Sequence, residues 1–425
     1  MSNKIKLLII THCIPYPLDS GGNVSQFAML EGLQKVMNVT LCLVANNDKD
    51  NLNIGQLQQL LPEVNIKVII LYQKNVPTNR FTIKNVKSIA KRFIQRFSSY
   101  KPLLYDEFLD GYRINPLQLK KENFINQLSE IFCNNKYDIA QVEFHECLEL
   151  IHVIPKSLKT TYVLHESRLL RLESASLITN TSKKFSQYII DINKAVELSL
   201  INRYDTVITF SEKDQERLKD LNVRNVVTIP FPILDCEFDN KNVFKAANQL
   251  VFIGGESHMP NKEGIDWFLK ECFDQIYKEF ELPLVIIGKW YNTKGYIDQF
   301  GEKIRFVGYI EDLNIILKES IMIVPIRIGN GIRAKILYGM AKKIPIISTG
   351  IGYEGIDIFD KTHLLKADDV ESFISCLRFI LSNNSEVNKI LESACSFVTH
   401  TYSQKVLTEQ RVSIYSRLLN TQLYS

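Results

Sequence analysis

The chain has 425 residues, of which 45% are hydrophobic and 23% are charged, a composition typical of a folded protein with large cores. Its formal net charge of +4 is too small to indicate nucleic acid as a partner, so any preference for anions must be local. The eight cysteines form no CxxC pair and no cluster with the spacing of a zinc site. No apolar run reaches the roughly 18 residues of a membrane span or the length of a secretory signal, so we expect a cytoplasmic protein.

Short apolar runs alternate with stretches of helical periodicity along the chain. In the first half, we interpret six such runs as strands: 6–11, 39–45, 67–71, 138–144, 160–165 and 205–210. After a proline-containing, polar linker at 230–248, the alternation restarts with runs at 249–255, 282–288, 304–308, 321–326 and 343–349. This order predicts two Rossmann-like α/β domains, each with a doubly wound parallel sheet, facing a central cleft. We place these domains at 1–235 and 236–404, followed by an amphipathic helix at 405–425.

Three glycine-bearing loops follow strands, at the sheet edge where parallel α/β domains bind ligands. Gly21 and Gly22 come after the first strand, "GNGIRAKILYGMA" spans 329–341, and "TGIGYEG" spans 349–355. Glycine lets the backbone approach a ligand closely, and a helix start presents free N–H groups to an anion. In the 329–341 stretch, two basic side chains arrive as helical periodicity begins, so we predict an anion site there. The alternative for the loops is ordinary turn chemistry, because glycines after strands are common.

The second half of the chain contains "FIGGESHMPNKEGIDWF", "IRFVGYIEDL" and "IVPIRIGNGIRAKILYGMAKKIPIISTGIGYEGI". The first half contains, in this order, "PYPLDSGG", "DIAQVEF", "VLHESRLLR" and "VITFSEKD". Taken together and in this order, these stretches resemble retaining glycosyltransferases with the two-domain GT-B fold, of the family 4 (group 1) type. The resemblance implies transfer of a sugar from a nucleoside diphosphate sugar to a glycan or lipid-linked acceptor, in the synthesis of a surface polysaccharide or glycolipid. It also implies that the helix at 405–425 packs back toward the first domain.

The resemblance assigns roles to residues that bind the donor. Arg333 and Lys335 match paired basic positions that stabilise the charge growing on the diphosphate as the glycosidic bond breaks. The other donor-binding positions lie in the glycine loops and in "VGYIED", whose backbone reads the base: Gly21, Gly22, Tyr309, Ile310, Gly329, Gly331, Thr349 and Gly352. The alternative for Arg333 and Lys335 is that both are solvated helix residues.

Strand-end residues of the first half complete the predicted site. His165, in "YVLHES", matches a family histidine near the transferred sugar, although an isolated His is often a structural residue. Glu143 and His145, in "VEFHE", lie at another strand end and are predicted to bind the acceptor. The resemblance implies no cofactor and no metal, with the nucleotide sugar acting as a substrate.

One position departs from the family pattern. A Glu that holds the ribose hydroxyls usually stands where this chain has Tyr338. A phenol can accept a hydrogen bond or stack on the nucleoside, but it lacks the charge-assisted strength of a carboxylate. We hypothesise that Glu354 takes over the ribose contact; the alternative is that catalysis is weak or absent.

A basic segment at 79–101 offers a membrane contact. It holds seven basic residues and no acid, and its apolar residues recur at helical spacing. Such a helix can lie on an anionic membrane surface, which would suit a lipid-linked acceptor and make the protein peripheral on the inner face of the membrane. The alternative is a helix that packs on its own domain and has a merely solvated polar face.

Other functions fit the sequence less well. The "DKD" at 48–50 could bind a divalent cation in a metal-dependent transferase of the single-domain A type, but that architecture has no place for a second α/β domain. A nucleotide-sugar epimerase on the same scaffold and a non-catalytic relative in a glycan assembly complex are the remaining alternatives. A dehydrogenase is excluded because no G-x-G-x-x-G follows the first strand of either domain.

Overall fold

The computed structural model describes residues 4–18, 20–71, 119–165, 167–169, 172–173, 182–238, 242–310, 312–329 and 331–420. The basic helix predicted at 79–101 lies outside these residues. Among the helices that are described, none combines the length and the apolar character needed to cross a bilayer.

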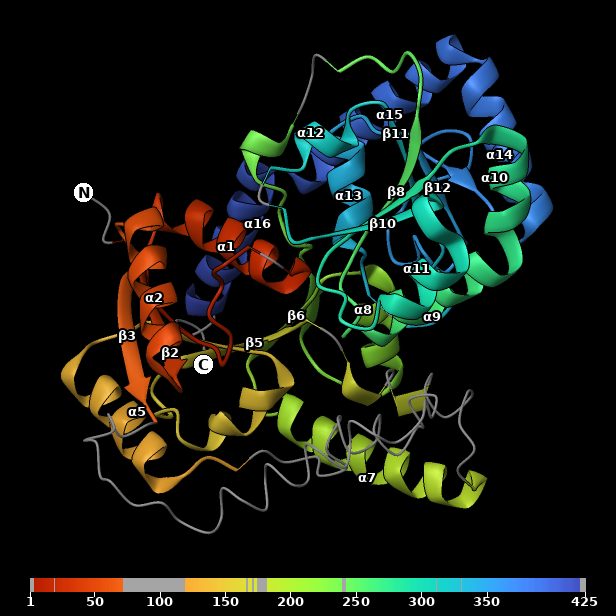
Figure 1. Ribbon diagram of the computed structural model, residues 1–425. Helices are drawn as coiled ribbons and strands as arrows, with labels where there is room; N and C mark the ends of the chain where they lie inside the picture. Colours follow the sequence, from red (N-terminus) through yellow and green to blue (C-terminus); the bar gives the residue numbers. More distant parts are fainter. Residues whose placement is uncertain are drawn as a thin grey trace, which may run out of the picture.

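Within the described residues, the first sheet has seven parallel strands in the order β3-β2-β1-β4-β5-β6-β7 (Figure 1). These strands are β1 (Lys6–Ile10), β2 (Asn38–Ala45), β3 (Asn65–Ile70), β4 (Ile139–Glu143), β5 (Lys159–Leu164), β6 (Thr206–Thr209) and β7 (Val226–Thr228). Strand β1 pairs with β2 on one side and β4 on the other. Its residues alternate between two buried clusters, Leu7 and Ile9 in one and Leu8 and Ile10 in the other, which explains its continuous apolar run.

The helices of the first half connect these strands. They are α1 (Gly21–Gln34), α2 (Asp48–Leu60), α5 (Glu122–Asn134), the 3-10 helix η1 (His145–His152), α7 (Lys183–Ile201) and α8 (Glu212–Asp220). Four of them begin after a polar residue whose side chain accepts a hydrogen bond from the first helical turn: Ser20, Asn47, Ser182 and Ser211. These caps fix where the helices start relative to the preceding strand ends.

The second sheet, in the part of the chain that the structure describes, has six parallel strands in the order β10-β9-β8-β11-β12-β13. These strands are β8 (Gln249–Ile253), β9 (Leu284–Ile287), β10 (Ile304–Gly308), β11 (Ser320–Val324), β12 (Ile346–Ser348) and β13 (Leu365–Lys366). Its helices include α9 (Met259–Trp267), α10 (Asp274–Phe280), α11 (Lys294–Phe300), α12 (Asn314–Leu317), α13 (Ala334–Ala341), α14 (Val370–Ser382) and α15 (Asn384–Tyr402). Short turns of other helix types lie at η2 (Asp235–Glu237), η3 (Phe268–Phe273) and η4 (Gly301–Lys303).

The last helix, α16 (Gln404–Asn420), returns to the first domain and lies beside α1 (Figure 1). The Gln404 amide donates to the carbonyl of Ala28 at 2.7 Å. A Cβ on Gly32 of α1 would lie 2.2 Å from Oγ1 of Thr408, so only glycine permits this close approach. One continuous buried cluster therefore runs from β1 and α1 through α16 into the second sheet.

The predicted fold class is confirmed: two parallel α/β domains with a C-terminal helix that packs back on the first. The predicted strands all occur, with ends that differ by at most three residues. Two edge strands, β7 and β13, had no prediction, because a strand of three or two residues gives too short an apolar run to recognise.

Candidate functional site

The glycine loop of the second domain joins β11 to α13. Gly329 and Gly331 have φ values of +95° and +84°, in the left-handed region that glycine adopts without strain. A Cβ on Gly329 would also lie 3.0 Å from Cγ of Pro260. Local conformation therefore requires both glycines, and the loop delivers the chain to the start of α13, where free N–H groups favour an anion.

Two cations lie at the start of α13. Arg333 is the N-cap residue and is 8% exposed; burial lowers its pKa to about 10, against the attraction of Glu354 and Asp214. Lys335 donates from Nζ to Oδ1 of Asn261 at 2.8 Å, and its Nζ lies 4.1 Å from the centre of the Phe252 ring. Burial and, to a smaller extent, the charge of Arg333 together lower the pKa of Lys335 to about 7. An anion at this helix start would relieve the repulsion between the two cations.

The loop after β12 is held by Thr349. Its hydroxyl donates to the carbonyl of Ile326 and accepts from the N–H of Gly352 at 3.0 Å. A Cβ on Gly352 would lie 2.2 Å from Oγ of Ser348, so packing explains this glycine. The loop is therefore rigid, and contact with a donor remains a prediction for both Thr349 and Gly352.

The first glycine loop and the loop that carries Glu354 each contact the opposite domain. A Cβ on Gly21, at the start of α1, would lie 3.4 Å from Cβ of Ala334, at the start of α13. Within the first domain, Gly22 faces Phe144, whose Cζ would lie 4.0 Å from a Cβ built on Gly22. Glu354 forms an ion pair with Lys213 of α8 in the first domain. The structure thus brings the first glycine loop against the helix that carries the two cations, as the predicted cleft requires.

The predicted base-side residues follow β10. Tyr309 is 43% exposed, whereas Ile310 packs against the core of the second domain. Gly308 before them has a φ of +70°, which turns the chain at the strand end. An exposed ring beside a glycine turn is compatible with stacking on a base, which stays a prediction.

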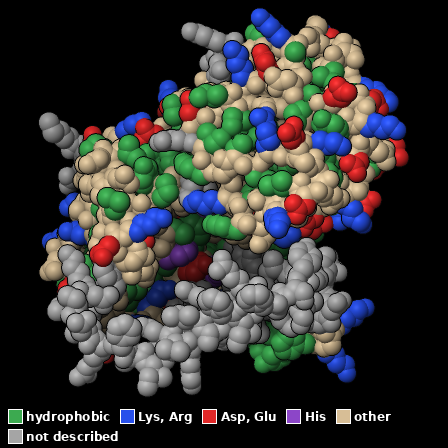
Figure 2. Space-filling model, viewed as in Figure 1, with side chains coloured by type: hydrophobic (Ala, Val, Ile, Leu, Met, Phe, Trp, Pro, Cys, Tyr) green, Lys and Arg blue, Asp and Glu red, His purple; other side chains and the backbone are tan. Residues whose placement is uncertain are grey.

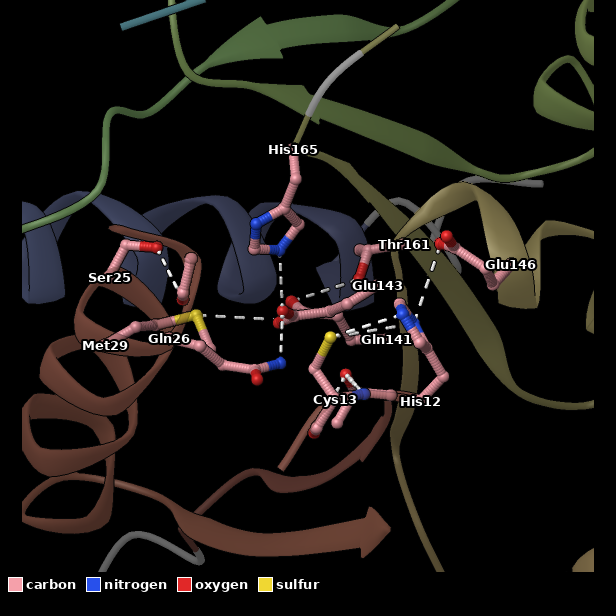
Figure 3. Close-up of polar contacts among 12 residues, drawn as sticks. His12, Cys13, Ser25, Gln26, Met29, Gln141, Glu143, Glu146, Thr161 and His165 are labelled. Carbon is pink, nitrogen blue, oxygen red and sulfur yellow. Dashed lines mark hydrogen bonds and ion pairs between the residues drawn. The ribbon is translucent and has the colours of Figure 1, made fainter. Parts of the chain in front are cut away.

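The ring of His165, at the end of β5, contacts Glu143 (Figure 3) and two aromatic rings. Its Nε2 lies 2.9 Å from Oε2 of Glu143. Phe144 stacks on the ring with 3.7 Å between centroids, and Phe210 makes an edge contact at 4.9 Å. An ionised carboxylate only accepts hydrogen bonds, so Nε2 carries a proton, and the other ring nitrogen points away from Glu143.

Glu143 lies beneath His165 and is 1% exposed. Its carboxylate accepts hydrogen bonds from the amides of Gln26 and Gln141, both at 2.6 Å. Burial alone would raise the pKa of Glu143, but the hydrogen bond and charge of His165, with Arg411 and Gln141, bring it below its ordinary value. Glu143 is therefore ionised and faces the interior. The acceptor-binding role of Glu143 stays a prediction, and its contacts favour a role in orienting His165.

Phe144 joins these groups in a strained conformation. Its φ of 65° and ψ of 151° fall in a region that is essentially restricted to glycine and that costs about 1–3 kcal/mol. Its ring also makes an edge contact with His12 at 5.0 Å. Strain of this kind is retained where the surrounding structure holds it, often at functional sites, and here it places an aromatic ring between Gly22 and His165.

A second polar group lies at the same sheet edge. His145 begins η1, and its Nε2 lies 3.2 Å from Oε1 of Glu146, whose other oxygen lies 3.6 Å from Nδ1 of His12. Burial lowers the pKa of His12 despite the attraction of Glu146. Figure 2 shows histidine and acidic side chains in a recess between the two halves of the molecule. The acceptor-binding role of His145 stays a prediction.

Tyr338 is directed toward the linker between the domains. Burial raises its pKa, and its hydroxyl donates a hydrogen bond to Glu237 of η2. Glu237 also pairs with Lys342 at 2.8 Å, and Nζ of Lys342 lies 5.6 Å from the Tyr338 ring centre. The family pattern has a carboxylate at position 338. In this chain the phenol at that position instead contacts a carboxylate from another part of the protein, that of Glu237.

Sequence reasoning did not identify several residues of this site. Asn261 holds Lys335, and Gln26 and Gln141 hold Glu143. No local pattern marks them, because each acts on a residue distant in the chain or is one of many buried amides. Phe144 lies inside the quoted "VEFHE", but only its backbone angles reveal its role.

Among the described residues, no group of three or more His, Cys, Asp or Glu side chains could hold a metal ion. Asp48 and Asp50 of "DKD" lie in the first turn of α2, where carboxylates stabilise a helix start, and Asp50 accepts from the N–H of Asn46 at 2.8 Å.

The facing α/β domains define the class: the chain has the GT-B fold of glycosyltransferases. Residues 247–383, most of the second domain, match the family model of the group 1 glycosyltransferases. Sucrose-phosphate synthase from Thermosynechococcus elongatus is similar with a TM-score of 0.68 at 13% identity, over 98% of this chain and 100% of that one. HepE of Anabaena in complex with UDP has a TM-score of 0.64 at 11% identity, over 97% and 100% of the two chains.

A relative detected by sequence covers nearly the whole chain. It is an uncharacterized 44.6 kDa protein from the cps region of Klebsiella pneumoniae, 22% identical over 426 residues. The match spans 94% of this chain and 97% of the relative, so the alignment extends through both domains of this chain.

Proposed function

We propose that this protein is a retaining glycosyltransferase that moves a sugar from a nucleoside diphosphate sugar to a glycan or lipid-linked acceptor. The observation that carries the proposal is the pair of cations, Arg333 and Lys335, at the start of α13, with Gly21 of the other domain packed against the same helix start. The group 1 family match over this domain and the UDP bound to HepE support a nucleotide sugar as the donor.

The chemistry needs positive charge at the leaving group. When the bond between the anomeric carbon and the diphosphate breaks, the electron pair stays on the phosphate oxygen. Arg333, Lys335 and the first N–H groups of α13 are fixed donors that stabilise this charge without reorganising. Because these groups supply the charge, we propose that the reaction needs no metal ion.

His165 and the α1 loop act on the transferred sugar. The Nδ1 side of the ring is directed away from Glu143, so it is the atom available to a sugar hydroxyl. Phe144 fixes the ring plane, and the backbone at Gly22 lies against Phe144. In this proposal the sugar lies between His165 and the cations of α13, and the acceptor attacks from the side of the departing diphosphate, which retains the anomeric configuration.

The acceptor approaches along the first domain. The group formed by His145, Glu146 and His12 supplies hydrogen-bond partners at that sheet edge. A saccharide hydroxyl can bond to such groups, whereas they offer little to an apolar molecule. The relative from a cps region supports a surface polysaccharide as the product class.

A non-catalytic role in a glycan assembly complex is the second candidate. The observation that favours it is Tyr338, whose hydroxyl bonds to Glu237. Glu354, which we proposed for the ribose, is in an ion pair with Lys213. If neither Glu237 nor Glu354 contacts ribose, nucleotide affinity would be weak and sugar release slow.

A thermal-shift screen against UDP-, GDP-, ADP- and dTDP-sugars tests the donor assignment. We expect one nucleotide class to raise the melting temperature of the wild type, and Arg333→Ala to abolish that rise. Arg378→Ala is the matched control, because Arg378 is exposed and bonds to Glu279 on the far helices of the same domain. No stabilisation by any nucleotide sugar, or equal stabilisation of Arg333→Ala, would overturn the proposal.

A further inference from the structure

A buried chain of hydrogen bonds connects the C-terminal helix α16 to His165. From α16, Nη1 of Arg411 lies 3.5 Å from the hydroxyl of Tyr415, and that hydroxyl contacts Oε1 of Gln141. The Gln141 amide donates to Glu143 at 2.6 Å, and Glu143 receives His165 at 2.9 Å. Gln141 and Tyr415 are fully buried, and Arg411 is only 2% exposed.

The chemistry of each group fixes the direction of the whole chain. The carboxylate of Glu143 is ionised and only accepts, so Gln141 must present its NH₂ to Glu143 and its carbonyl to Tyr415. Tyr415 must then donate to that carbonyl and use a lone pair for Arg411, which is a donor only. Every donor is directed toward Glu143, with a positive charge at one end and a negative charge at the other. A burial-raised pKa keeps Tyr415 neutral in this sequence.

Arg411 also lies close to Glu143, because both side chains line a small cavity beneath His165. Arg411, Gln26, Glu143 and His165 all line it. The Nε of Arg411 and the Oε1 of Gln26 are buried without a hydrogen-bond partner in the structure, so both polar groups remain available to the cavity. A positive charge in a low-dielectric space favours the ionised form of the carboxylate opposite it.

We propose that Arg411 and Tyr415 of α16 are positioning residues for His165: through Gln141 they hold Glu143 ionised and fixed, and Glu143 holds the imidazole with Nε2 protonated and Nδ1 available to substrate. The helix that follows the second domain in sequence thus completes the reactive centre of the first. The catalytic meaning of this arrangement depends on the proposed function, but the coupling between α16 and His165 is a property of the protein alone.

The first test needs no substrate. In protein labelled with ¹⁵N histidine, the His165 ring is assigned by its loss in His165→Gln, and its Nε2 proton is followed in wild type, Tyr415→Phe and Tyr402→Phe. We expect an upfield shift of this proton in Tyr415→Phe, which removes one hydroxyl, and no shift in Tyr402→Phe. Tyr402 is a matched control because it is also buried, at 3% exposed, and ends the preceding helix α15. An unchanged His165 signal in Tyr415→Phe would overturn the inference, whatever the activity of the protein.

The second test uses the nucleotide sugar that stabilises the wild type most. We expect Tyr415→Phe to lower kcat about tenfold, the scale of one hydrogen bond to a charged group, with little change in KM for the donor. In a Glu143→Gln background, the same change should have almost no further effect, because both act through one carboxylate. Additive effects in this cycle would contradict a route through Glu143. A shifted His165 signal in a protein that transfers no sugar would refute the proposed function while the coupling stands.

The third test is the acid limb of the pH profile of kcat/KM. The titratable or charged groups that face Glu143 are His165 after β5, Arg411 and Tyr415 on α16, and Cys13 after β1, whose pKa burial raises to about 12. Arg411 favours the carboxylate, so in Arg411→Gln the pKa of Glu143 rises and the acid limb moves to higher pH. An acid limb at the wild-type position in a folded Arg411→Gln protein would contradict this part of the inference.

Discussion

We predict that nucleotide binding is accompanied by the uptake of a proton at the amino group of Lys335. In the free protein, burial and the neighbouring Arg333 lower the pKa of Lys335 to about 7, so the side chain becomes neutral as the pH rises above 7. A bound diphosphate favours the charged form and returns the pKa toward its ordinary value. Binding therefore competes with deprotonation, and affinity must fall as the pH rises through this range.

The size of the effect follows from the pKa. A group with a pKa of about 7 is protonated in roughly 24% of molecules at pH 7.5 and roughly 1% at pH 9, so UDP affinity should fall about 25-fold. Isothermal titration with UDP, in buffers of different ionisation enthalpy, measures both the affinity and the proton uptake. Working above pH 7.5 keeps the terminal phosphate of UDP, with a pKa of about 6, fully ionised.

Lys335→Arg is the control, because guanidinium stays charged throughout and should remove the pH dependence while keeping the anion site. Asn261→Ala, which removes the Nζ partner at 2.8 Å, should lower affinity but retain the pH dependence. Equal UDP affinity at pH 7.5 and pH 9, with no proton uptake at pH 9, would show that Lys335 does not contact the diphosphate.

Two further predictions concern stability, measured as the free energy of unfolding in urea. Gly264→Ala should lower the free energy of unfolding by about 1–3 kcal/mol, because the added Cβ would lie 2.5 Å from the carbonyl oxygen of Pro325. Gly55→Ala is the control at an open helical position and should raise the free energy of unfolding by up to about 1 kcal/mol. A neutral Gly264→Ala would mean that the loop before the cations can move. Tyr338→Phe removes the hydrogen bond to Glu237 and should cost about 1 kcal/mol. Undiminished stability in this variant would argue that the phenol is directed elsewhere.

The fold could be predicted because its signals are local. Strands buried on both faces, such as β1, are continuous apolar runs in the sequence, and glycines with helix starts mark the loops that follow them. The first glycine loop, Arg333 and Lys335 were found in this way. The proximity of Gly21 to the start of α13 could also be predicted, because both loops lie at the carboxyl ends of parallel strands.

The supporting contacts could not be predicted because they join distant parts of the chain. Gln141 meets Tyr415 across 274 positions, and nothing in the helical pattern of α16 distinguishes Tyr415 from an ordinary core residue. Glu143 was recognised as a strand-end acid, but its burial beneath His165 depends on the packing of α1 and α16 around it. Tyr338 was recognised as a departure from the family pattern, while its partner Glu237 lies in the linker, which has no pattern of its own.

In the proposed reaction, the cations of α13 drive departure of a nucleoside diphosphate from its sugar. The most direct measurement is nucleoside diphosphate release from the stabilising nucleotide sugar, in the presence of a polysaccharide extract as acceptor, by wild type, Arg333→Ala and Arg378→Ala. We expect release by the wild type and by Arg378→Ala, and loss of release in Arg333→Ala. If the nucleotide sugar stayed intact with the wild-type protein, or if Arg333→Ala released as much nucleoside diphosphate as the wild type, the role of these cations would be contradicted.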